Sequence, residues 1–276
     1  MRVWTEADAH DRIAVPVAGD DKYSRGVLGV VTGSDAYPGA AVLGVEAAMR
    51  TGVGMVRYLA DERPTMFVLQ RRPEVVTAAG RVQAWLLGSG MDAAHRDERT
   101  ERRLQDALAQ DVPAVIDAGA LDLASGARGP VIVTPHFREL SRLLSVNDID
   151  ASAEEISADP AAWAGRAADR LDVTVLLKGA TTYVAAPGGE TLSASFGTAW
   201  LATAGTGDVL GGILGAFVAT HADAVARDGH AALARLGASA AVLHGLAARR
   251  ASRGGPIAAL DVADAVPATA AELLAD

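Results

Sequence analysis

The stretch from residue 202 to residue 214 reads Ala-Thr-Ala-Gly-Thr-Gly-Asp-Val-Leu-Gly-Gly-Ile-Leu and is the strongest local signal in the chain. Small residues and two glycines stand directly before an apolar segment, which exposes backbone N–H groups at the positive end of a helix. Phosphate groups bind at such a position because the N–H groups and the helix dipole both favour an anion. The stretch therefore predicts a phosphate-binding loop that leads into a buried helix.

Asp208 falls in the first turn of this expected helix, where aspartate is common for structural reasons alone. A carboxylate beside an anion hole can also accept the proton of a substrate hydroxyl, while the amides of Gly205, Thr206 and Gly207 hold a phosphoryl group. Position alone leaves both interpretations open. Because a helix start favours the charged form, we expect the pKa of Asp208 to be lowered and its carboxylate to be ionised at neutral pH.

Upstream of this loop, short apolar runs alternate with amphipathic segments. The runs are rich in β-branched residues and are flanked by Gly, Pro or charge, which is typical of buried strands. Such alternation predicts an α/β fold, a mostly parallel sheet covered by helices on both faces. The expected strands are residues 27–32, 54–59, 84–87, 114–117, 131–134 and 173–177, and the expected helices are 40–50, 98–109, 137–144 and 155–171.

The order of elements changes toward the C-terminus. Residues 181–186 and 191–195 are separated by Pro187-Gly188-Gly189-Glu190, which predicts a β-hairpin near the edge of the sheet. Helices are expected at 209–219, 230–250 and 262–274. No linker rich in Pro, Gly or Ser interrupts the chain, and no internal repeat occurs, so residues 1–276 are expected to form a single domain.

The composition is that of a globular, mildly acidic protein. Of the 276 residues, 50% are hydrophobic and 21% are charged, with a formal charge of −9. No uninterrupted apolar run reaches the roughly 18 residues that cross a bilayer, and acids stand where a signal peptide needs an apolar stretch. We therefore expect a cytoplasmic protein that has no membrane partner. The acidic balance argues against nucleic acid as a partner, and the lack of cysteine excludes disulfides and thiolate metal sites.

Several common functional motifs are missing from the sequence. There is no G-x-x-x-x-G-K-[ST] loop, no H-E-x-x-H and no G-x-S-x-G elbow. Residues 205–211 approach a dinucleotide fingerprint, but the last glycine comes one place late and the segment lies far from an early strand, which disfavours a Rossmann oxidoreductase. The six histidines show no metal-ligand spacing, so we predict no metal ligands and expect a metal ion to arrive with phosphate.

The order and spacing of motifs across residues 22–267 resemble the ADP/ATP-dependent NAD(P)H-hydrate dehydratases, a branch of the ribokinase-like superfamily. Gly-Thr-Gly-Asp before a long helix resembles the anion-hole motif of that superfamily. Only two of the 25 basic residues are lysine, and both, Lys22 and Lys178, fall inside matching segments. These segments are 22–26 (Lys-Tyr-Ser-Arg-Gly), 33–34 (Gly-Ser), 37–41 (Tyr-Pro-Gly-Ala-Ala), 50–54 (Arg-Thr-Gly-Val-Gly), 72–75 (Arg-Pro-Glu-Val), 117–121 (Asp-Ala-Gly-Ala-Leu), 134–136 (Thr-Pro-His) with Glu139, 177–181 (Leu-Lys-Gly-Ala-Thr) and 205–212.

The resemblance implies a ribokinase-like three-layer α/β/α sandwich and repair of the (S)-hydrates of NADH or NADPH. In these hydrates, water has added across the enamine double bond of the nicotinamide ring. Phosphorylation of the ring hydroxyl by ADP or ATP, with Mg²⁺, makes it a good leaving group, and the ring nitrogen then expels phosphate. In this scheme Asp208 accepts the hydroxyl proton, and the amides of residues 205–207 hold the phosphoryl group.

The resemblance also implies contacts for both ligands. Those with the adenine nucleotide are Lys178, Gly179, Ala180, Thr181, Thr182 and Gly207, and those with the hydrated dinucleotide are Ala41, Gly90, Asp117, His136 and Asp208. From position alone, His136 can equally cap the helix that follows it, and Glu139 is an ordinary first-turn acid. Asp117 can orient a loop at the edge of the sheet rather than touch substrate.

Four substrate-side segments depart from the family pattern. Residues 88–92 read Gly-Ser-Gly-Met-Asp instead of Gly-Pro-Gly-Leu-Gly, Gly119 replaces an aspartate, Phe137-Arg138 replaces Pro-Gly, and residues 197–200 read Gly-Thr-Ala-Trp instead of Gly-Asn-Pro-Gly. They leave two alternatives open, a small-molecule kinase similar to hydroxyethylthiazole kinase and a catalytically silent nucleotide-binding relative. The resemblance further implies a homo-oligomer, with a tetramer favoured. Any epimerase activity is expected on a separate chain.

Overall fold

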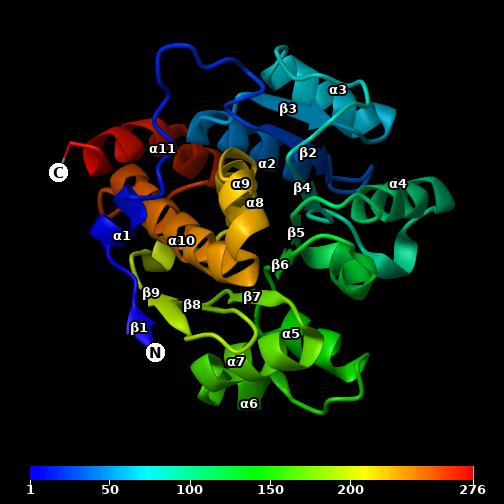
Figure 1. The fold of residues 1–276 in the computed structure, drawn as a ribbon, viewed down its shortest axis with the longest axis vertical. Coiled ribbons are helices and arrows are strands. Elements are labelled where there is room, and N and C mark those ends of the chain that lie inside the picture. The colour runs from blue at the N-terminus through cyan, green and yellow to red at the C-terminus, as the bar shows by residue number, and fades with distance from the viewer. Residues whose placement is uncertain (276) are drawn as a thin grey trace.

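A single nine-stranded sheet runs through the computed structural model, which describes residues 1–275 (Figure 1). Its strand order is β1-β9-β8-β7-β6-β5-β4-β2-β3. Every neighbouring pair is parallel except β7 with β8 and β8 with β9, which are antiparallel. The predicted parallel sheet with a hairpin near one edge is thus confirmed. The strands are β1 (Arg2–Val3), β2 (Val27–Val31), β3 (Met55–Tyr58), β4 (Ala84–Leu87), β5 (Ala114–Ile116), β6 (Val131–Val133), β7 (Thr174–Leu177), β8 (Thr182–Ala185) and β9 (Leu192–Ala194).

Helices cover both faces of this sheet, which makes the sandwich three layers thick. One face carries α1 (Glu6–His10), α2 (Pro38–Thr51), α3 (Glu62–Arg71), α8 (Thr206–Thr220), α9 (Ala222–Asp228), α10 (His230–Ser252) and α11 (Ala259–Leu273). The other carries α4 (Glu98–Leu108), α5 (Phe137–Ser145), α6 (Ala153–Ala158) and α7 (Pro160–Leu171). Alternate residues of each strand enter one apolar core or the other, as the two-residue period of a strand requires: Leu86 lies in the core that contains α8, and Leu87 lies in the core that contains α4.

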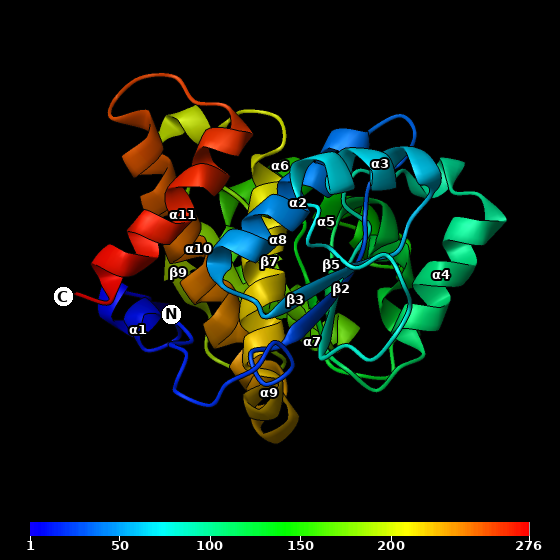
Figure 2. The same cartoon turned by 90° about the horizontal axis from the view of Figure 1, so that it is seen from above.

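Helix α8 is central to the fold because it carries the predicted phosphate loop at its N-terminus. Figure 2 shows it lying between α2 and α10 over the middle of the sheet. A Cβ added at Gly212 would stand 2.2 Å from the carbonyl oxygen of Gly44, so only glycine allows this approach of α8 to α2. The contact fixes α8 in place. Its neighbour α10 is long and apolar enough to cross a membrane, but 83% of its apolar window is buried inside the domain.

The sequence predictions miss β1, α1, α3 and α9, and they merge α6 and α7 into one helix. The helix expected over residues 155–171 is wrong as one element, because α6 ends before Asp159 and α7 begins at Pro160, where proline fits the first turn and Asp159 caps the N-terminus. Helix α3 was not predicted, since only Pro64 and Val68 are buried on it and its apolar pattern is weak.

Candidate active site

The predicted phosphate loop is an uncapped helix N-terminus. Gly205 occupies the N-cap position of α8 with φ +90°, and no side chain caps the helix there. The hydroxyl of Thr206 donates to the carbonyl oxygens of Leu201 and Thr203, both at 2.9 Å, which holds the preceding turn in shape. The N–H of Thr206 donates to the carbonyl oxygen of Thr203 at 3.4 Å, while those of Gly207 and Asp208 make no backbone hydrogen bond within residues 1–275 and can bind an anion.

Asp117 follows β5 and is the most completely bonded carboxylate in this region. It is 3% exposed and accepts hydrogen bonds from Lys178 Nζ at 2.8 Å, Thr134 Oγ1 at 2.8 Å and Ser89 Oγ at 3.0 Å. Burial acts to raise the pKa of Asp117, but the Lys178 ammonium and these hydrogen bonds outweigh it and lower the pKa. Asp117 is therefore held as a carboxylate whose oxygens are already engaged by the protein.

Lys178 follows β7 and brings its ammonium to the phosphate loop. Its Nζ lies 3.7 Å from Glu139 Oε2 and 3.6 Å from the position that a Cβ on Gly207 would take. Burial acts to lower the pKa of Lys178, but Asp117, Glu139 and Asp208 raise it above the ordinary lysine value. The cation thus stands between a substrate-side carboxylate and the amides at the start of α8, rather than extending into solvent.

Asp208 contradicts the expectation of a lowered pKa. Burial, followed by the negative charge of Asp117, raises the pKa of Asp208 to about 7, and Lys178 offsets only part of this effect. The expectation considered the helix dipole alone, which is a small term beside the loss of hydration. Asp208 is consequently a carboxyl group that takes up and releases a proton near neutral pH.

His136 is the N-cap of α5. Its Nδ1 accepts from the backbone N–H of Glu139 at 3.2 Å, and the Glu139 carboxylate accepts from the backbone N–H of His136 at 2.8 Å, which completes a capping box. The structural interpretation of both residues is confirmed. The ring remains half exposed, so contact of His136 with a ligand stays a prediction.

Ala41 and Gly90 lie where the loops after β2 and β4 meet the start of α2. Ala41 is fully buried beneath Gly33, and a Cβ on Gly90 would stand 2.4 Å from that of Ala40. These residues fix the shape of a narrow strip of backbone. The strip separates the Asp117 and Lys178 pair from the loop that contains Ser34.

The predicted nucleotide segment, residues 179–182, forms the turn between β7 and β8. Gly179 and Ala180 are exposed, and Thr181 and Thr182 are half-buried. A Cβ on Gly179 would lie 3.1 Å from the ring of Phe137, so the turn packs against the start of α5. The structure brings this turn close to Lys178 and leaves its outer surface open.

Two residues that bind Asp117 were not singled out from the sequence. Ser89 stands where the family usually has proline, and its hydroxyl supplies one of the three hydrogen bonds to Asp117. Thr134 lies inside a matching segment, and that is the signal that could have found it. Gly119, the missing carboxylate, also has a structural reason, because a Cβ there would lie 2.4 Å from the carbonyl group of Met91.

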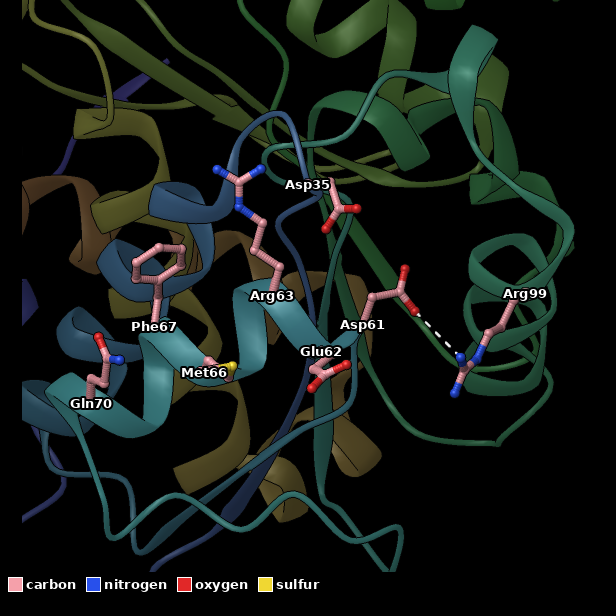
Figure 3. A pocket seen from close by; sticks show the side chains of 8 residues that line it. All are labelled: Asp35, Asp61, Glu62, Arg63, Met66, Phe67, Gln70 and Arg99. Carbon is pink, nitrogen blue, oxygen red and sulfur yellow. Dashed lines mark ion pairs between the residues drawn. The ribbon is translucent and has the colours of Figure 1, made fainter.

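A separate hollow of about 570 Å³ lies beside α3, away from the residues predicted from the sequence. Figure 3 shows it between α3, the loop that carries Asp35 and the start of α4. Its lining combines charged, amide and apolar side chains: Asp35, Asp61, Glu62, Arg63, Met66, Phe67, Gln70 and Arg99. Within residues 1–275, no group of three or more His, Asp or Glu side chains is arranged to hold a metal ion, there or at Asp208.

Comparison with known proteins places this site in a family. A family model described as NAD(P)H-hydrate dehydratase matches residues 28–267. The chain is 41% identical over 225 residues to the bifunctional NAD(P)H-hydrate repair enzyme Nnr of Mycobacterium tuberculosis, an alignment that covers 77% of this chain and 45% of that protein. It is 36% identical over 213 residues to the ADP-dependent (S)-NAD(P)H-hydrate dehydratase of Neisseria meningitidis, which covers 70% and 69% of the two chains.

Solved structures give the same result for the whole chain. The ADP/ATP-dependent NAD(P)H-hydrate dehydratase of Bacillus subtilis, co-crystallised with ATP and Mg²⁺, superposes with a TM-score of 0.84 at 26% identity and covers 99% of this chain and 98% of its own. A hydroxyethylthiazole kinase from Pyrococcus horikoshii shares the fold at a TM-score of 0.63 and 19% identity. The chain spans about half the length of the bifunctional relatives that it matches. It belongs to the NAD(P)H-hydrate dehydratase family of the ribokinase-like fold.

Proposed function

We propose that this protein restores NADH and NADPH from their (S)-hydrates in a reaction that consumes an adenine nucleotide. The observation that carries the proposal is the uncapped start of α8, with the Asp208 carboxyl and the Lys178 ammonium both beside it. An anion site, a base and a cation at one point are the parts that phosphoryl transfer to a hydroxyl group needs. Family membership supplies the identity of that hydroxyl.

In the first step, Asp208 accepts the proton of the ring hydroxyl. The hydroxyl oxygen forms a bond to the terminal phosphorus of the nucleotide, and the bond from that phosphorus to the bridging oxygen breaks, which releases AMP from ADP. The amides at residues 205–207 hold the phosphoryl oxygens during transfer. A base whose pKa lies near 7 suits this role because it can both take and return a proton at neutral pH.

In the second step, the ring nitrogen expels the new phosphate ester. Its lone pair forms a C=N bond as the C–O bond breaks, and phosphate leaves with the electron pair of that bond. Loss of a proton from the adjacent ring carbon then restores the double bond of the reduced nicotinamide. The net change is removal of water from the hydrate, coupled to hydrolysis of the nucleotide.

Lys178 would bind the phosphoryl group, and Asp117 would hold Lys178 in place. The ammonium lies 2.8 Å from Asp117 and next to Gly207, so it reaches the phosphate end of the nucleotide rather than its base. The exposed turn at residues 179–182 remains for the nucleoside part. Asp117, with all its bonds made inside the protein, acts as a positioning residue instead of the substrate contact expected from the resemblance.

The remaining partners follow from the same proposal. ADP is the favoured phosphoryl donor, as in the names of the Neisseria and Bacillus relatives. Because no ready-made cluster of metal ligands occurs in residues 1–275, Mg²⁺ would be held mainly by the nucleotide phosphates and would neutralise their charge. A cytoplasmic location, a homo-oligomer and an epimerase on a separate chain also remain proposals.

The test is recovery of reduced nicotinamide absorbance. Purified protein is incubated with hydrated NADH, Mg²⁺ and either ADP or ATP, and wild type is compared with Asp208→Asn. Recovery that depends on both nucleotide and Asp208 is the expected result. Nucleotide consumption with a stable phosphorylated product would instead indicate a small-molecule kinase, and nucleotide binding without turnover would indicate a silent relative.

A further inference from the structure

The hollow beside α3 opens on the same edge of the sheet as the candidate active site. Asp117 and Lys178 follow the carboxyl ends of β5 and β7, and the hollow is built on the segments that follow β2 and β3. Ligands of parallel α/β sheets bind outside these carboxyl ends. The order β5-β4-β2-β3 places the hollow about three strand spacings, roughly 14 Å, from Asp117.

The loops that lie between the two places pack closely through glycine. Gly33, Gly88 and Gly90 all have positive φ, and the N–H of Gly33 donates to the carbonyl oxygen of Ser89 at 2.7 Å. A Cβ on Gly90 would also stand 3.2 Å from the Cα of Gly33, so the two loops touch through glycine. Gly33 and Gly88 are buried and Gly90 is half-buried, so a ligand that reached from Asp208 to the hollow would pass over Gly90 and beside the exposed Tyr37.

The hollow offers groups for a nucleoside. Phe67 is 43% exposed, and Arg63, one helical turn before it on α3, rises toward the loop that carries Asp35 (Figure 3). Asp61 is engaged by Arg103 at 2.8 Å and by Arg99 at 3.9 Å. Among residues 1–275, Arg63, Asp35 and Glu62 make no ion pair, which leaves one cation and two carboxylates for a ligand.

We propose that the hollow binds the adenosine end of the hydrated dinucleotide and selects NADH hydrate over NADPH hydrate. This inference rests on the proposed function. The adenine ring stacks on Phe67, Arg63 binds the pyrophosphate, and the Asp35 carboxylate accepts a hydrogen bond from the adenosine ribose. A 2′-phosphate would bring further negative charge toward Asp35 and Glu62, which disfavours the NADPH form.

The test compares a whole substrate with a truncated one. Phe67→Ala and Arg63→Ala are assayed with hydrated NADH and with hydrated reduced nicotinamide mononucleotide, which lacks the adenosine half. We expect each variant to lower kcat/KM for the dinucleotide about tenfold, mostly through KM. Phe67→Ala should leave the mononucleotide unaffected, and Arg63→Ala should affect it less than the dinucleotide, because the mononucleotide keeps one phosphate. Arg102→Ala is the matched control, because Arg102 is an exposed arginine on α4 that does not line the hollow.

The selectivity has its own readout. Wild type is expected to prefer hydrated NADH over hydrated NADPH, and Asp35→Asn with Glu62→Gln is expected to reduce that preference severalfold. An equal loss of kcat/KM on the whole and truncated substrates, or no loss on either, would overturn the proposal that the hollow binds the adenosine end. The proposed function would stand in both cases. A change in oligomeric state of Phe67→Ala with an unchanged substrate ratio would make the hollow a contact between copies. If wild type turns over neither hydrate, both proposals fall.

Discussion

Two clusters of buried charge in this domain have opposite effects on their carboxylates. Glu46 on α2 is fully buried, and its oxygens accept from Arg50 and Arg72 at 2.6 Å and from Arg71 at 3.1 Å. Burial acts to raise the pKa of Glu46, but these arginines lower it to about 2. Asp208 shares one lysine with Asp117, and its pKa rises to about 7. The difference lies in the hydrogen bonds from cations, which Glu46 accepts and Asp208 does not, so burial raises the pKa only of Asp208.

The two clusters also differ in what they join. Arg50 and Arg71 reach Asp264 at 2.8 and 3.3 Å, so the Glu46 cluster connects α2, α3 and α11. The Asp208 cluster joins loop ends at the edge of the sheet and faces the uncapped start of α8. We therefore expect substitutions in the first cluster to lower stability and substitutions in the second to lower activity.

The largest expected effect is that of Asp208→Asn. Loss of the base should reduce kcat about 10³-fold. The raised pKa means that the native state holds a proton that the unfolded chain releases between pH 3.8 and about 7, so wild-type stability falls as pH rises through this window. Asn does not titrate, so this dependence of stability on pH is absent from the variant. Thermal melts should show a higher Tm for the variant than for wild type at pH 8 and little difference at pH 4. A variant that is both inactive and less stable at pH 8 would contradict this account.

Glu46→Gln should come next, with a loss of about 3 kcal/mol in unfolding free energy, because it leaves three arginines without their shared anion. Denaturant unfolding measures the loss, and kcat at low temperature should stay near wild type. The lowered pKa means that this stabilisation is present above pH 4.5 and disappears between pH 4.5 and about 2, so the two proteins should converge in acid. Glu74→Gln is the matched control, since the Glu74 side chain is 45% exposed and its one ion pair within residues 1–275 is with Arg72.

Lys178→Met should reduce kcat/KM about 100-fold, as expected for one lost contact to a phosphoryl group in transfer. Without the ammonium, nothing offsets burial and the charge of Asp117, so Asp208 holds its proton more tightly and the acid limb of the pH–rate profile should move to higher pH. The exposed Lys22→Met is the control. An unchanged acid limb would show that Lys178 does not act on Asp208.

Asp117→Asn should have the smallest effect, about a tenfold loss of kcat/KM with the acid limb moved down by roughly one pH unit. The sign is opposite to that of Lys178→Met, because the change removes a negative charge and frees the ammonium to approach Asp208. The exposed Asp111→Asn serves as the control. Displacement of both limbs in the same direction would indicate general disruption of the site rather than a change in charge.

The sequence predicted the fold well because its signals are local. Short β-branched runs between Gly and Pro located six of the strands to within a few residues, and the hairpin turn located β8 and β9, while β1 was not predicted. Helix α3 and the break before Pro160 were missed, since the first buries little and the second depends on one capping aspartate.

The site was predicted in position but not in chemistry. The Gly-Thr-Gly-Asp stretch gave the location of the anion site, yet the pKa of Asp208 depends on Asp117 and Lys178, which are 91 and 30 residues away along the chain. Such long-range charge contacts have no local signature. The hollow beside α3 was not predicted from the sequence for the same reason, because Asp35, Phe67 and Arg99 come together only through the order of the strands.

The pairing of Lys178 with Asp117 has a consequence for chemical handling of the protein. Amine reagents attack only the neutral amine, and the carboxylates around Lys178 keep it protonated, while Lys22 is exposed. Since these are the only lysines in the sequence, acylating dyes or resins near neutral pH should modify the α-amino group of Met1 and the Lys22 side chain and spare that of Lys178. The enzyme can therefore be labelled or immobilised through amine chemistry with its phosphate site intact.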